Sequence, residues 1–126
     1  CPTDSNAHPH VSEDSSIAVI HNGIIENFAE LRAELTAAGV TLSSETDTEV
    51  AAHLLAATMS AAGGNLTDAM RMVCSRLEGA FTLVAIDKAQ PDLVVAARCI
   101  LAPPLLMLVL VLAAVVVPAA SPLASG

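Results

Sequence analysis

Ile17-Ala18-Val19-Ile20-His21-Asn22-Gly23-Ile24-Ile25-Glu26-Asn27 is the stretch that decides the fold of this chain. Its first four residues form a short apolar run bounded by polar residues, which is typical of a buried β-strand. A helix is predicted to follow, capped by Asn27 with Glu30 and ended by Gly39. Apolar residues recur at helical spacing, at Ile24, Phe28, Leu31, Leu35 and Ala38. The sequence therefore predicts a domain of mixed α and β structure.

Two more helices are predicted downstream of this one. The second starts near Thr46, where Thr46 and Glu49 match a capping box, and it runs to Gly63-Gly64. The third starts near Asn65 and ends before Gly79. Its apolar face is formed by Leu66, Ala69, Met70, Val73 and Leu77.

Two strands are predicted after the third helix. The segments 80–86 and 93–97 are apolar and rich in residues that favour strands. The polar stretch 87–92 separates them, so we expect an antiparallel pair.

Composition limits the classes of function. The chain has 126 residues and a net charge of −8, with 13 acidic against 5 basic residues, so it would repel a phosphate backbone. Aromatic residues make up 2%, which leaves no stacking platform for bases, and we expect no nucleic-acid partner. Cys1, Cys74 and Cys99 form neither a disulfide framework nor a metal knuckle, which indicates a reducing cytoplasm.

The charges stop abruptly along the chain. All of them lie at or before Arg98, and residues 99–126 contain none. The apolar run Leu105–Val117 has 13 residues, whereas a spanning helix needs roughly 20, so we expect no membrane anchor. We predict one domain over residues 1–98 and an uncharged tail over 99–126 that is unrelated to it.

Three short blocks point to a chemistry through their order and spacing. They are Asn6-Ala7-His8-Pro9-His10, His21-Asn22-Gly23-Ile24-Ile25-Glu26-Asn27 and Glu45-Thr46-Asp47-Thr48-Glu49. Together they resemble the glutamine-hydrolysing domain of the glutamine–fructose-6-phosphate aminotransferase family, over roughly residues 2–98. Amidotransferases of purine synthesis share the His-Asn-Gly part of the second block and a Ser/Thr-Asp-Thr-Glu segment like that of the third. They usually lack His-Pro-His and Ile-Ile-Glu-Asn, which therefore favour the fructose-6-phosphate family.

The resemblance assigns Asn22 and Gly23 to the oxyanion hole. Amide hydrolysis needs donors aimed at the oxyanion, and a side-chain amide beside a Gly N–H can place two donors on one point. Asn-Gly after an apolar run is also a hairpin signal, but a helical pattern follows here instead of a partner strand.

The resemblance also implies two residues that recognise glutamine. The residue matching Asp47 binds the α-amino group, although an acid at a helix start is also favoured by the helix dipole alone. The residue matching His8 lies beside bound glutamine, although His8 could be an ordinary loop residue. Metal binding by His8 and His10 is the other alternative, but no spacing matches a known metal site.

The nucleophile of the family is an N-terminal Cys, and Cys1 does not match it. In the family that Cys precedes Gly-Ile-Val-Gly and lies far upstream of the His-Pro-His block, whereas Cys1 precedes Pro2 and stands close to His8. We therefore expect this chain to lack the nucleophile segment and to be inactive alone. Cys74, in a packed helix, is predicted to be a buried apolar residue.

The resemblance implies an α+β fold, the four-layer αββα sandwich of N-terminal-nucleophile hydrolases, incomplete at its N-terminal edge. The implied reaction releases ammonia from glutamine and uses it, in a separate isomerase domain, to convert fructose 6-phosphate to glucosamine 6-phosphate. It implies no metal or organic cofactor, a homo-oligomeric parent enzyme and a cytoplasmic location. The alternatives are a non-catalytic degenerate copy with an apolar tail, or the glutaminase domain of another class II amidotransferase.

Overall fold

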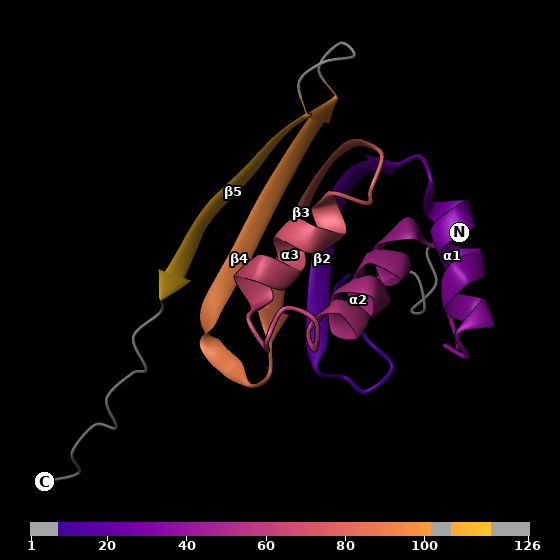
Figure 1. The fold of residues 1–126 in the computed structure, drawn as a ribbon, viewed down its shortest axis with the longest axis horizontal. Helices are drawn as coiled ribbons and strands as arrows, with labels where there is room; N and C mark the ends of the chain where they lie inside the picture. The colour runs from indigo at the N-terminus through magenta and orange to yellow at the C-terminus, as the bar shows by residue number, and fades with distance from the viewer. Residues whose placement is uncertain (1–7, 102–106, 117–126) are drawn as a thin grey trace, which may run out of the picture.

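The computed structural model describes residues 8–101 and 107–116, which form a sheet with helices against one face (Figure 1). The sheet has the order β1-β2-β3-β4-β5, and each neighbouring pair is antiparallel. The strands are β1 (His10–Val11), β2 (Ile17–Ile25), β3 (Gly79–Asp87), β4 (Gln90–Leu101) and β5 (Met107–Val116).

Three helices connect β2 to β3 and cover the sheet. They are α1 (Phe28–Ala37), α2 (Asp47–Thr58) and α3 (Leu66–Cys74). Helix α2 packs on β2 and α3 packs on β4, while α1 contacts α2 at the side of the layer (Figure 1). All three predicted helices are confirmed, although α2 ends at Thr58 and turns, not helix, lead to Gly63-Gly64. The antiparallel pair that becomes β3 and β4 is confirmed as well.

The core lies between the helices and one face of the sheet. Along β3 every second residue is buried, from Gly79 to Asp87, as expected for a strand with one covered face. Helix α3 presents its predicted apolar face to this core, with Met70 and Val73 fully buried. The opposite face of the sheet exposes Ile20 and Ile24, at 52% and 68%.

Strand β2 is longer than the sequence predicts. It continues through Asn22 and Gly23 to Ile25, in register with β3 from Ile17↔Asp87 to Ile25↔Gly79. Ile24, predicted to lie on the apolar face of the first helix, is instead a strand residue with an exposed side chain. The prediction was wrong because the β3 partner, distant in sequence, extends the strand.

Both predicted capping boxes are also wrong. Asn27 precedes α1 but makes no capping bond; its amide instead donates to Arg76 O and accepts from Glu78 N, at 2.8 and 2.9 Å. Thr46 precedes α2 without capping it, and Glu49 bonds to the preceding loop. Tertiary partners therefore replace the local capping contacts.

Part of the predicted tail belongs to the sheet. β5 pairs with β4 from Leu93↔Val116 to Leu101↔Met107. Among the described residues, none of the helices has the length and apolarity needed to cross a bilayer. The domain boundary after Arg98 stays a prediction.

Candidate active site at the end of β2

Asn22 and Gly23, the predicted oxyanion donors, lie in β2 near its end. The strand alternates, so His21 and Ile25 are buried toward the helices whereas Asn22 is exposed on the opposite face. Gly23 has φ of +109°, a conformation that residues with a side chain rarely adopt. A Cβ there would overlap Ala80 O and lie 2.8 Å from Phe81 Cα. The backbone at this point therefore requires glycine.

A hollow of about 310 Å³ lies beside this pair. Its lining residues come from three neighbouring strands, and Arg98 is the charged residue among them. They are Asn22, Gly23, Ala80, Phe81, Thr82, Arg98 and Cys99. Asp47 is not among the residues that line it.

Asp47 lies on the other side of β2, at the first residue of α2. Its Oδ2 accepts a hydrogen bond from Ile25 N at 3.2 Å, and its Oδ1 lies 3.4 Å from His21 Nδ1. Burial alone would raise the pKa of Asp47, but the hydrogen bonds from His21 and from the Ile25 N–H lower it below the usual value. Its side chain remains 23% exposed, so the carboxylate can still meet a ligand.

His21 is a buried residue beside Asp47, and the sequence analysis assigned it no role. Its Nδ1 lies 3.1 Å from Thr48 Oγ1, close to Asp47. Its Nε2 is buried and has no hydrogen-bond partner among the described residues. The His21 ring therefore connects β2 to the start of α2.

His8 and His10 stand together just before and at the start of β1. Their ring centroids are 5.5 Å apart in an edge-to-face arrangement; His8 is exposed and His10 is buried. His10 Nε2 lies 3.1 Å from Thr46 Oγ1, which joins β1 to the loop before α2. Burial and the neighbouring His8 lower the pKa of His10, so the ring is held neutral.

Glu49 anchors the loop before α2. Its two oxygens accept four hydrogen bonds, from the N–H and hydroxyl groups of Ser43 and Ser44, at 2.7 to 2.8 Å. Burial opposes ionisation, but these bonds lower the pKa of Glu49 to about 2. His53 Nε2 lies 3.6 Å from the same carboxylate. Sequence reasoning missed this role because it placed Glu49 in a local cap.

The cysteines do not join this group. Cys1 lies outside the described residues. Cys74 is fully buried in α3, as predicted, and burial beside Cys99 raises the pKa of its thiol to about 12. Across residues 8–101 and 107–116, no three His, Cys, Asp or Glu side chains are grouped closely enough to hold a metal.

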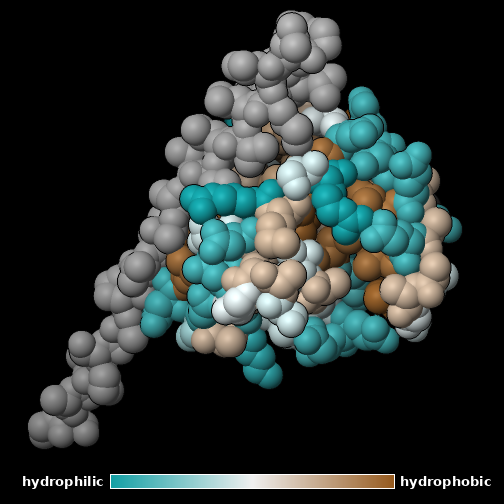
Figure 2. All heavy atoms as spheres, in the orientation of Figure 1, coloured by the Kyte–Doolittle hydropathy of each residue, from teal (hydrophilic) through white to brown (hydrophobic). Residues whose placement is uncertain are grey.

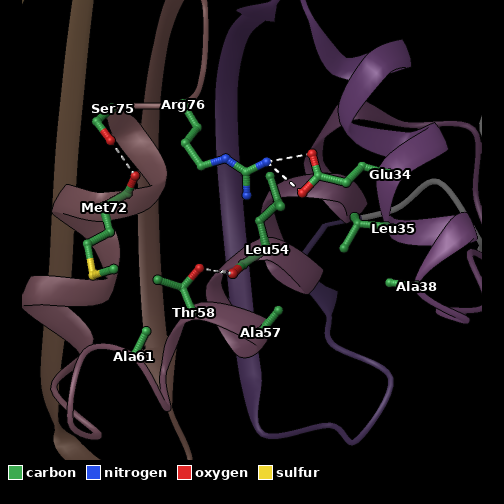
Figure 3. Close-up of a pocket in the computed structure, with 10 residues that line it drawn as sticks. All are labelled: Glu34, Leu35, Ala38, Leu54, Ala57, Thr58, Ala61, Met72, Ser75 and Arg76. Carbon is green, nitrogen blue, oxygen red and sulfur yellow. Dashed lines mark hydrogen bonds and ion pairs between the residues drawn. The ribbon is translucent and has the colours of Figure 1, made fainter.

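A larger groove, of about 440 Å³, lies between the three helices. Apolar surface shows in this part of the helical layer, surrounded by polar side chains (Figure 2). Arg76 spans the groove and pairs with Glu34 at 2.6 Å, while Leu54 and Met72 form part of the lining (Figure 3). None of the predicted site residues lies in this groove.

Comparison with protein families gives one match over most of the chain. Residues 1–118 match the family described as "Glutamine amidotransferase domain". The chain is 64% identical over 97 residues to glutamine–fructose-6-phosphate aminotransferase of Streptomyces coelicolor and 62% identical to that of Leifsonia xyli. Each alignment covers 77% of this chain but only 16% of the relative, so the chain spans a small part of those proteins.

Solved structures share the fold at lower identity. Glutamine phosphoribosylpyrophosphate amidotransferase from B. subtilis superposes with a TM-score of 0.64 at 25% identity, covering 77% of this chain and 21% of the other. The allosteric regulatory enzyme of purine biosynthesis superposes with a TM-score of 0.62 at 26% identity. The predicted α+β fold of the N-terminal-nucleophile hydrolase type is confirmed, and the described residues supply one sheet and one helical layer of it.

Proposed function

Because this chain belongs to the glutamine amidotransferase domain family, we propose that the end of β2 and the start of α2 form the glutamine-recognising part of a glutaminase site. Asn22 Nδ2 and Gly23 N donate to the oxyanion that forms when the carboxamide carbon is attacked. Asp47 binds the α-amino group, and His8 lies beside the substrate. Neither described cysteine suits the role of nucleophile, because Cys74 and Cys99 are buried and burial raises the pKa of each thiol.

One contact carries most of this proposal. The bond from Ile25 N to Asp47 Oδ2 ties the proposed amino-group ligand to the strand that holds Asn22 and Gly23. Asn22 projects to the other face of the sheet, so glutamine must lie across the strand end, with its two ends on different sides. A substrate extended along this path suits glutamine, whose carboxamide and α-amino group are at opposite ends.

The wider reaction is proposed from the relatives. Identity is 64% to a glutamine–fructose-6-phosphate aminotransferase and 25% to a phosphoribosylpyrophosphate amidotransferase, which favours fructose 6-phosphate as the acceptor of the ammonia. An isomerase domain would then make glucosamine 6-phosphate. A cytoplasmic homo-oligomer that needs no metal or organic cofactor completes this proposal.

The experiment that tests the proposal uses a host that contains the rest of the domain. Residues 8–98 of this chain replace the matching segment of the full-length Streptomyces coelicolor relative, and glutamate release from glutamine is measured. We expect the chimera to hydrolyse glutamine. Asp47→Asn keeps an acceptor for Ile25 N but loses the charge, so KM for glutamine should rise by about 10-fold or more while kcat changes little.

The control is Asp92→Asn, which removes an exposed carboxylate at the start of β4. It should leave KM and kcat unchanged. A folded chimera that hydrolyses no glutamine, or an Asp47→Asn variant with the KM of the unsubstituted chimera, would contradict the proposed function.

A further inference from the structure

Four side chains form a continuous chain of hydrogen bonds under the proposed site. Glu49 accepts from Ser44 Oγ at 2.7 Å, Ser44 Oγ lies 2.9 Å from Thr46 Oγ1, and Thr46 Oγ1 lies 3.1 Å from His10 Nε2. Glu49, Ser44 and His10 are buried, with 6% exposure or less. The chain of bonds runs from α2, through the loop before it, to β1.

The number of available protons determines which atom donates in each of these hydrogen bonds. An ionised carboxylate has no proton to donate, so the single hydroxyl hydrogen of Ser44 points to Glu49. Ser44 Oγ can then only accept, so the hydroxyl hydrogen of Thr46 points to Ser44. Thr46 Oγ1 must in turn accept from His10, which places the ring proton of His10 on Nε2.

Glu49 is ionised in the folded protein, so it can only accept hydrogen bonds. Its carboxylate accepts two backbone N–H bonds in addition to the two hydroxyl bonds, and backbone donors cannot reverse. These same bonds hold its pKa at about 2. The two backbone N–H donors and the charge of Glu49 therefore determine how the hydroxyl groups of Ser44 and Thr46 are oriented.

These hydrogen-bonded side chains lie next to both proposed substrate ligands, His8 and Asp47. His10 is separated from His8 only by Pro9, and its ring contacts the His8 ring edge to face. Thr46 directly precedes Asp47, and Glu49 lies within the first turn of the same helix. Displacing Thr46 would therefore disturb His8 and Asp47 together.

We propose that Glu49, acting through Ser44, Thr46 and His10, is a positioning residue that fixes His8 and Asp47 relative to each other for binding glutamine. This inference extends the proposed function and depends on it for the substrate. None of Glu49, Ser44 or Thr46 needs to touch glutamine. Their effect is on the geometry of the residues that do.

The test breaks one hydroxyl contact in the chimera described above. Thr46→Val keeps the shape of the side chain but cannot bridge Ser44 and His10, whereas Thr46→Ser keeps the hydroxyl. We expect Thr46→Val to raise KM for glutamine about fivefold with kcat unchanged, and Thr46→Ser to restore the original KM.

A second readout needs no substrate. Nitrogen NMR of the His10 ring should show the proton on Nε2 in the unsubstituted chimera and in Thr46→Ser, and a mixture of tautomers in Thr46→Val. A ring proton on Nδ1 in the unsubstituted protein, or equal KM values in all three proteins, would overturn the inference. A chimera with the expected tautomers but no glutaminase activity would instead overturn the proposed function and the substrate role, leaving the hydrogen-bond chain itself established.

Discussion

The Asp47 carboxylate accepts a hydrogen bond from the backbone N–H of Ile25 at 3.2 Å, which ties the start of α2 to the end of β2. The donor is backbone in a paired strand, so its position is set by the sheet rather than by a flexible side chain. The Asp47 carboxylate is therefore bound at Ile25, which is two residues after Gly23 in the same strand. This contact joins the proposed amino-group ligand directly to the strand that carries the proposed oxyanion donors.

Removing the Asn22 side chain should slow the chemical step. Asn22→Ala in the chimera loses one oxyanion donor, so kcat for glutamine hydrolysis should fall by about 100- to 1000-fold, with little change in KM. Thr82→Ala is the control, because Thr82 pairs with Asn22 across the sheet and lines the same hollow. It should retain kcat. Equal kcat values for the two variants would remove Asn22 from the oxyanion hole.

Adding one methyl group at Gly23 should destabilise the protein. The Cβ of Gly23→Ala would overlap Ala80 O and strain a backbone at φ +109°. The free energy of unfolding should therefore fall by at least about 2 kcal/mol. Gly39→Ala is the matched control: φ there is +90°, but nothing lies within 4 Å of the new Cβ. Urea unfolding should show a clearly smaller loss for Gly39→Ala. Equal losses would mean that strain alone acts at Gly23.

Glu49 should make stability depend on pH in the acid range. Its folded pKa is about 2 against 4.5 for the unperturbed group, so its contribution is complete above about pH 4.5 and is lost as the pH falls toward 2. The difference corresponds to about 3 kcal/mol. Unfolding by urea should therefore distinguish the unsubstituted chimera from Glu49→Gln strongly at pH 6 and weakly at pH 2. A gap that stays constant with pH would contradict this origin.

The sequence predicted the fold where a periodic pattern is repeated over several residues. The apolar spacing of α3 is strong enough to define its buried face, from Leu66 to Val73. The end of β2 was mispredicted because Ile24 fits a helical spacing as well as a strand. The register of β2 with β3 decides between them, and that pairing joins residues far apart in the sequence.

The site was predictable only as a set of residue types. The motif blocks indicated Asn22, Gly23, Asp47 and His8, and the structure places Asp47 beside the strand that contains the first two. It does not place Asp47 in the hollow beside Asn22. Glu49 shows why the rest was missed: its four bonds depend on how the Ser43–Ser44 loop folds back, which no local rule gives.

The open face of the sheet should make the isolated chain poorly soluble, and polar substitutions there should have opposite effects in two contexts. Ile20, Ile24 and Ile86 are 46% to 68% exposed on this face, and such apolar surface promotes association. Replacing all three with Thr, which keeps strand propensity, should raise the soluble monomer yield of the isolated chain several-fold. Met72→Thr, which replaces an exposed apolar side chain on α3 instead of on the sheet, should not.

In the chimera we expect the second sheet of the αββα fold to cover this face, so the same triple substitution should lower stability by about 1 to 3 kcal/mol per buried side chain. Gel filtration of the isolated chain and urea unfolding of the chimera measure the two effects. Solubility gained without any loss of stability in the chimera would mean that this face is not covered there. A monomeric isolated chain that melts cooperatively before any substitution would show that the described residues are a self-sufficient fold.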